Sequence, residues 1–281
     1  MPLSALKLRL LVASLLTVSL LGALDHTIVA TSLATVAGEL GGLEQMGWIV
    51  VGYTLAGTVL LPVIGRLGDS LGHRNVFLVS LVAFLLASLL CGFAQDMLQL
   101  TLARVVQGMG SAGLQLMSQV IIAAVTTPRQ RPRYLGIIGA AFPIAILIGP
   151  VVGGLITDHW GWPWIFWINL PFGCAALLLA LVAIPHIDRG PRRRFDFAGA
   201  SVFTVALVAL VFAVSWVGDP DAARPAVIAF TAALIGFAAF AAIELRTPEP
   251  IIPLRLFANR TIAAGTALSA IIGIGLFSIT A

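Results

Sequence analysis

Asp25 and Arg104 are charged residues inside long apolar stretches of the sequence, and their side chains could carry proton chemistry. A charge in the middle of a bilayer costs on the order of 3 kcal/mol on insertion scales, so its presence needs a physical reason. Burial favours the protonated form of a carboxylate, whereas a neighbouring guanidinium favours the ionised form. A carboxylate and an arginine in one cavity could therefore bind a proton, and release it when the arginine moves or a substrate arrives.

The two residues must lie at a similar depth for this chemistry to work. Asp25 lies in the second half of the first apolar stretch, and Arg104 lies near the start of an antiparallel stretch, so both are expected near the same membrane face. A first helix that ended at Leu24 would instead leave Asp25 in the membrane interface. Apolar or small residues continue beyond Asp25, which favours a buried position and a contact with Arg104.

The composition of the 281-residue chain indicates that lipid is its solvent. Hydrophobic residues make up 59% of the sequence and charged residues 10%, and the mean hydropathy is +1.05. A water-soluble domain of this length does not bury so much apolar surface. Nine apolar runs are each long enough for a membrane-crossing helix, which needs about 20 residues. The runs cover residues 8–36, 46–65, 76–95, 98–123, 134–157, 163–184, 197–217, 225–243 and 261–281.

These runs are predicted to be helices, because lipid offers backbone groups no hydrogen-bond partner and the alternating strands of a closed barrel are absent from the sequence. The first run could instead be a signal peptide, since Lys7 and Arg9 precede it, but no small-residue cleavage site follows. The predicted fold class is an all-α polytopic membrane protein.

Charge in the connections predicts the orientation of the chain. Of the 16 Lys and Arg residues, 14 fall on the side of the N-terminus, and the opposite connections are acidic. The positive-inside rule therefore predicts a cytoplasmic N-terminus. The predicted location is the plasma (cytoplasmic) membrane. The sequence pI of about 9.8 follows from this topology and from contacts with the cytoplasmic leaflet, so no nucleic-acid partner is inferred.

Two polar linkers suggest how the chain is divided. Pro185–Asp196 and Arg246–Arg260 are rich in proline and charge, whereas the other connections are short. We expect an N-terminal six-helix lobe over residues 1–184. A linker with two further helices follows over 185–245, and a linker with the first helix of another lobe covers 246–281.

In the run 134–157, small residues recur at every fourth position, and the last two of them are Gly149 and Gly153. Pro150 and Gly154 lie next to these two glycines. Small residues let membrane helices approach closely. Pro150 removes one backbone hydrogen bond, so a hinge is a second interpretation. Both interpretations can hold together.

The polar segment Gly65–Arg74 (GRLGDSLGHR) resembles the signature loop between helices 2 and 3 of the major facilitator superfamily. It matches that loop at Gly65, Leu67, Asp69, Gly72 and Arg74, and departs from it at Ser70 and His73, where basic residues are usual. The resemblance implies that Asp69 and Arg74 form a cytoplasmic gate-side latch.

Two further motifs resemble the proton-coupled members of that family. Arg104, Gln107 and Gly108 are similar to the helix-4 proton-coupling motif, and Gly149, Pro150, Gly153 and Gly154 to the helix-5 motif of antiporters. LDHTIVATSLA resembles the helix-1 motif of the fourteen-helix drug:proton antiporters, with Ala30 and Ala34 replacing the usual asparagine and proline. WPWIFWINLPFG, FDFAGA and PLRLFANR are also similar to that branch.

This resemblance implies proton-coupled efflux of small amphipathic or cationic drug-like molecules by alternating access across the lipid bilayer. Asp25 and Arg104 would then couple protons to transport. Such folds bind substrate between two lobes, and the sequence holds only the first helix of a second lobe. We therefore expect a missing C-terminal lobe. The alternatives are an exporter of a specific metabolite, and a truncated remnant or assembly partner that does not transport.

The sequence offers no pattern typical of an enzyme. It has no nucleophile–base spacing, no metal-ligand cluster and no phosphate-binding glycine loop, so no catalytic residue, metal or cofactor is predicted.

Overall fold

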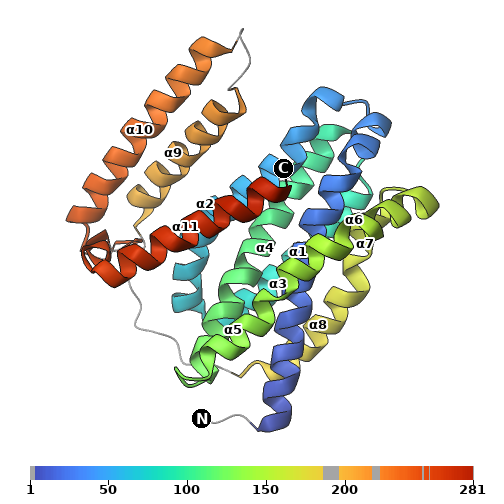
Figure 1. Cartoon of the computed structure of the whole chain (residues 1–281), viewed down its shortest axis with the longest axis horizontal. Coiled ribbons are helices and arrows are strands. Elements are labelled where there is room, and N and C mark those ends of the chain that lie inside the picture. The colour runs from blue at the N-terminus through green and yellow to red at the C-terminus, as the bar shows by residue number, and fades with distance from the viewer. Residues whose placement is uncertain (1–3, 186–195, 217–221, 249, 253, 281) are drawn as a thin grey trace. The chain divides into compact units, whose positions relative to one another are not determined.

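The computed structural model describes residues 4–185, 196–216, 222–248, 250–252 and 254–280 (Figure 1). Every regular element in these residues is a helix, which confirms the all-α prediction. The chain divides into two compact units, Met1–Arg192 and Arg193–Ala281. Each unit is described by itself, and the predicted three-part division of the chain stays a prediction.

The first unit is a bundle of six apolar spans, two of which are each built from two α-helices. Its elements are α1 (Ala5–Glu39), η1 (Leu43–Gln45), α2 (Met46–Leu71), α3 (His73–Gly92), α4 (Met97–Val125), α5 (Arg131–Gly139), α6 (Ala141–Trp160), α7 (Trp164–Trp167) and α8 (Asn169–Ala183). Helix α4 packs on α2 and α3, and α1 packs on α6 and α8.

Two spans are interrupted, and each interruption lies just before a proline. The helix predicted over 134–157 breaks at Ala140, because Pro143 has no N–H to donate to the Gly139 carbonyl. The break between α7 and α8 at Ile168 precedes Pro171 in the same way. Helix α6 continues through Pro150 without a break, so the interruption of this span is at Pro143, and a hinge at Pro150 stays a prediction.

Apolar packing in this unit forms two clusters along α1 and α3. One cluster includes Leu15 of α1 and Phe84 of α3, and the other includes Ile28 of α1 and Cys91 of α3. The residues between the clusters, Asp25 on α1 and Ser88 on α3, are polar and buried. The apolar packing therefore encloses a small polar centre.

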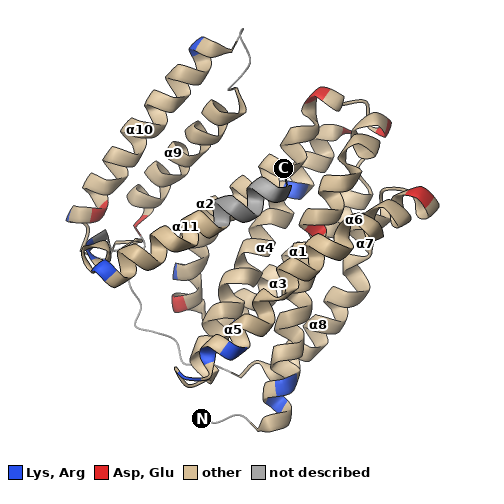
Figure 2. Cartoon of the chain, in the orientation of Figure 1, with Lys and Arg blue, Asp and Glu red and all other residues tan. Residues whose placement is uncertain are grey.

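The two ends of the first unit carry opposite charge (Figure 2). Basic residues occupy the first turns of α1 and α5, and acidic residues lie near the far ends of α1 and α6. This separation is the pattern from which a cytoplasmic N-terminus was predicted, and the orientation stays a prediction.

The second unit contains α9 (Phe197–Ser215), α10 (Ala223–Arg246), η2 (Leu254–Ala258) and α11 (Arg260–Thr280). Helices α9 and α10 pack on each other, with Gly236 against Ala206 and Phe203 against Phe240. Both are long and apolar enough to cross a membrane, which brings the candidate spans among the described residues to eight. The apolar part of α11 counted there, Arg260–Ile272, is shorter.

Glu244 fastens the connection after α10. Its side chain is buried, and its two oxygens accept hydrogen bonds from the backbone N–H groups of Ile251 and Ile252, at 3.1 Å each. A carboxylate near the C-terminal end of a helix is disfavoured by the helix dipole, so these donors compensate for an unfavourable position. Glu244 thereby fixes the path of the chain from α10 toward α11.

Replacing Glu244 with Ala is expected to loosen this connection. Hydrogen bonds to a charged group contribute about 1.5–3 kcal/mol each, so we expect a loss of about 2 kcal/mol in the unfolding free energy of the second unit. The measurement is the thermal unfolding midpoint in detergent, with the rate of proteolysis within residues 247–259. Arg246→Ala, an exposed change at the same helix end, is the control, and equal proteolysis of the two variants would contradict the role of Glu244.

Candidate functional site

Asp25 of α1 and Arg104 of α4 form a buried ion pair. Nη1 of Arg104 lies 2.6 Å from Oδ2 of Asp25, and each residue is only 1% exposed. Helix α1 continues past Asp25 to Glu39, so the alternative in which the first helix ends at Leu24 is wrong. The contact expected between the two residues is present.

Two amide side chains complete the surroundings of the carboxylate. Oδ1 of Asp25 accepts hydrogen bonds from Nε2 of Gln107 at 2.9 Å and from Nδ2 of Asn169 at 3.0 Å. The same two nitrogens also donate to Oγ of Ser88, at 3.1 and 2.9 Å. Arg104 in turn donates to Oε1 of Gln107 at 2.7 Å. Helices α1, α3, α4 and α8 therefore meet at one polar centre.

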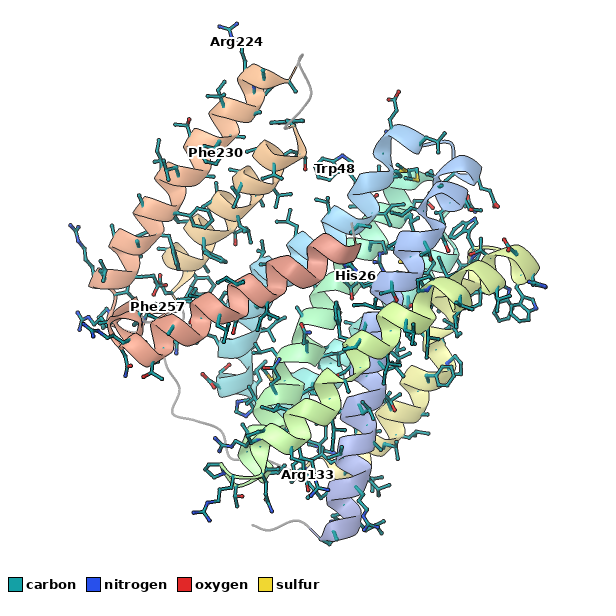
Figure 3. All side chains as sticks on the ribbon, viewed as in Figure 1. His26, Trp48, Arg133, Arg224, Phe230 and Phe257 are labelled. Atoms are coloured by element: carbon teal, nitrogen blue, oxygen red, sulfur yellow. The ribbon has the colours of Figure 1, made fainter. Side chains whose placement is uncertain are left out.

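Aromatic rings line the arginine side of this centre. The guanidinium carbon of Arg104 lies 4.1 Å from the ring centroid of Tyr53 and 5.8 Å from that of Phe166. A cation held over an aromatic face is stabilised by the ring quadrupole. His26, which follows Asp25 on α1 and is labelled in Figure 3, packs edge-on against Tyr53 at a centroid distance of 6.3 Å.

This arrangement pairs one buried negative charge with one buried positive charge. The ion pair is neutral as a whole, so its burial is tolerated as long as both partners remain. The described residues contain no group of three His, Cys, Asp or Glu side chains that could hold a metal.

Glycines of α4 let the surrounding helices come close to the centre. A Cβ on Gly108 would collide with the backbone carbonyl of Tyr53 on α2, and one on Gly110 would lie 2.8 Å from the backbone nitrogen of Phe84 on α3. Only glycine permits such close helix contacts. Gly108 therefore brings Tyr53 to the position where its ring meets Arg104.

The small residues of α6 divide into two faces. Gly149 and Gly153 pack against Thr27 and Ile28 of α1, whereas a Cβ on Gly154 would meet no atom within 4 Å. The Thr27 hydroxyl donates across this contact to the Ala145 carbonyl at 3.2 Å. Close packing of α6 on α1, one of the two predicted interpretations, is present at the residues just after Asp25.

Gly149→Ala and Gly154→Ala form a matched pair that tests this contact. The methyl group that Gly149→Ala adds would clash with the Thr27 hydroxyl. This change should lower the unfolding free energy by about 1–3 kcal/mol. The second faces open space, so we expect no loss and a gain of up to about 1 kcal/mol from helix propensity. Unfolding midpoints in detergent give the comparison. Equal midpoints for the two variants would exclude a packing role for Gly149.

The polar loop between α2 and α3 contains the residues of the implied latch. Gly72 adopts φ +94°, which side chains other than glycine rarely adopt, and joins the two helices. Asp69 Oδ1 lies 3.5 Å from Nε2 of His73, and Nη2 of Arg74 donates to the Leu181 carbonyl in the last turn of α8 at 2.8 Å. His73 thus lies beside Asp69, and the latch role of Asp69 and Arg74 stays a prediction. Gly65 lies on α2, and a Cβ there would make an ordinary contact with Leu116.

Sequence reasoning missed three residues of the site: Tyr53, Ser88 and Asn169. Asn169 had a usable signal, because an amide in an otherwise apolar span is costly and needs a partner. Ser88 and Tyr53 had none, since both residue types are common in membrane helices without a polar role.

A bundle of apolar spans that buries an ion pair at its centre defines a polytopic membrane protein. The sequence profile of the Major Facilitator Superfamily matches residues 15–281, and the chain belongs to this family. Membership places the chain among transporters rather than enzymes.

Curated relatives agree with this family, and a solved structure shares the fold. The chain is 36% identical over 273 residues to the multidrug transporter protein MdtP of Bacillus subtilis, covering 96% of this chain and 50% of the relative. It is 34% identical over 275 residues to multidrug resistance protein 3 of the same organism, covering 97% and 54%. The POT family transporter PepTSo shares the fold, with a TM-score of 0.61 and 12% identity over 87% of this chain and 54% of that one. The chain spans about half the length of the two Bacillus relatives.

Proposed function

We propose that this chain is part of a proton-driven exporter that moves small amphipathic or cationic molecules out of the cell by alternating access. The observation that carries the proposal is the Asp25–Arg104 pair, buried at the centre of a membrane bundle. The names of the two Bacillus relatives support multidrug efflux as the kind of transport. Protons and a small-molecule substrate are the proposed partners.

The proposed cycle links the protonation of Asp25 to the position of Arg104. In the ionised state, the carboxylate holds the arginine and α1 is tied to α4. Protonation removes that attraction, so the arginine is released from the carboxylate and the conformation in which α1 and α4 are tied together is no longer favoured. Deprotonation on the other side of the membrane restores the pair. Export would be driven because the proton enters as the substrate leaves.

The proposed location is the cytoplasmic membrane, with the N-terminus in the cytoplasm. The separation of basic and acidic residues between the two ends of the first unit supports this orientation (Figure 2). Substrate would bind near the bilayer midplane between this lobe and a second one, so the second lobe is part of the proposal.

Transport in vesicles tests the proposal. The full-length gene product is reconstituted into proteoliposomes with a fluorescent lipophilic cation, and a pH gradient is imposed in either direction. The expected result is cation movement opposite to the proton gradient, together with proton movement reported by a trapped pH dye. A rate of cation movement that does not depend on the pH gradient would contradict proton coupling. Absence of any movement would favour a specific metabolite exporter or a non-transporting assembly partner.

A further inference from the structure

In its side-chain hydrogen bonds with Arg104, Gln107 and Asn169, the Asp25 carboxylate is always the acceptor. All three side chains that contact the carboxylate, Arg104, Gln107 and Asn169, do so through N–H groups. An ionised carboxylate only accepts, whereas a protonated one must also donate. In this arrangement, a proton on Asp25 has no acceptor among the three.

Ser88 determines which end of the two amide side chains faces Asp25. Its hydroxyl donates to the Phe166 carbonyl at 2.9 Å, which uses its single hydrogen. Its oxygen can then only accept, so the amides of Gln107 and Asn169 must both present nitrogen to it. The same nitrogens reach Asp25. The backbone carbonyl of Phe166 thus determines, through Ser88, which end of each amide faces the carboxylate.

The two amides differ in what else constrains them. Oε1 of Gln107 accepts from Arg104 at 2.7 Å and lies 3.5 Å from Sγ of Cys91, so turning this amide would place nitrogen against the guanidinium. For Asn169, the contacts that fix its orientation are those of its nitrogen with Asp25 and Ser88. Asn169 is therefore the amide whose turning costs less, and the one that can offer its oxygen to a protonated Asp25.

We propose that Asn169, with its orientation set by Ser88, is a positioning residue that holds Asp25 in its ionised, arginine-paired state. Proton uptake then requires the Asn169 amide to turn, which breaks its contact with Ser88 and loosens α8 from α3. The other titratable or charged groups around Asp25 are Arg104 from α4, Tyr53 from α2, Cys91 from α3 and His26 on α1 itself. The use of this equilibrium in transport rests on the proposed function; the positioning itself does not.

Infrared titration of the carboxyl group tests the proposal without transport. The full-length protein in lipid is titrated with pH, and the protonated-carboxyl band that Asp25→Asn removes is assigned to Asp25. Asn169→Leu keeps the side-chain size and removes a donor, so we expect the midpoint of this band to move up by about one pH unit. Ser88→Ala frees both amides to turn and should move the midpoint in the same direction.

Ser14→Ala is the matched control. The Ser14 hydroxyl is as buried as that of Ser88, and it also donates across helices to a backbone carbonyl, that of Ala176, at 2.9 Å. Ser14 lies about three helical turns before Asp25 on α1, so its loss should leave the Asp25 midpoint in place. Ser88→Ala also keeps the test open if Asn169→Leu fails to fold.

The outcomes separate this proposal from the proposed function. Midpoints of the Asn169 and Ser88 variants that match that of Ser14→Ala overturn the positioning role, whatever the flux. Shifted midpoints in a protein whose Asp25→Asn variant still exports against the pH gradient support the positioning role and overturn proton coupling at Asp25.

Discussion

Asp25→Asn is expected to lower pH-driven export by about tenfold or more, because an amide cannot take up and release the proton that a carboxylate carries. Substrate exchange without a pH gradient does not require a change of protonation, so it should persist. The measurement compares the two modes in the same proteoliposomes. A selective loss of the driven mode identifies Asp25 as the coupling carboxylate.

Asp158→Asn provides the control for this prediction. Asp158 is an exposed carboxylate near the end of α6, on a span that packs against α1 but outside the polar centre. Its replacement removes one negative charge from the same lobe and should leave both modes unchanged. Driven export that survives in the Asp25→Asn protein at the rate of the Asp158→Asn protein would rule out the coupling role.

The membrane spans and the contact between Asp25 and Arg104 could be predicted, because each follows from one general physical rule. Lipid demands internally bonded backbone, so long apolar runs become helices, and the ends of α1 and α4 fall within a few residues of the predicted runs. A charge within such a run needs a partner, and Asp25 and Arg104 were the pair at matching depth. The functional roles of Gln107, Pro150 and Gly154 remain predictions.

The rest of the site could not be predicted because it depends on pairwise geometry between helices. Apolar periodicity does not indicate which serine of α3 faces α8. Ser88 could therefore not be predicted, although it accepts hydrogen bonds from the Gln107 and Asn169 amides. The resemblance marks Asp69 and Arg74 as latch residues, but it does not indicate that Arg74 donates to the Leu181 carbonyl of α8 or that His73 lies beside Asp69. The sequence likewise does not indicate which of two prolines in one span will interrupt the helix. In the structure the helix is interrupted at Ala140, just before Pro143.

Arg104→Met should be the most destabilising single change in the first unit. It keeps an apolar side chain under Tyr53 but leaves Asp25 as a buried charge with two amide donors. Removing one partner of a buried pair costs about 3–5 kcal/mol. Protonation would neutralise the remaining carboxylate, so the deficit should shrink as pH falls and grow as pH rises. Arg133→Met, which removes an exposed arginine from the first turn of α5, should change little at any pH.

The double variant Asp25→Asn, Arg104→Met distinguishes loss of the pair from loss of packing. With both charges gone, no uncompensated charge is buried, so the double variant should be more stable than Arg104→Met alone and nearly independent of pH. Unfolding midpoints of the wild type, both single variants and the double variant in detergent at low and high pH give the coupling free energy. Additive effects of the two changes would mean that the arginine contributes through its stacking on Tyr53, and the ion pair would then be a weak link between α1 and α4. A large coupling that appears only at high pH would instead show that the charge on Asp25 ties these helices together, which is the property that alternating access by protonation requires.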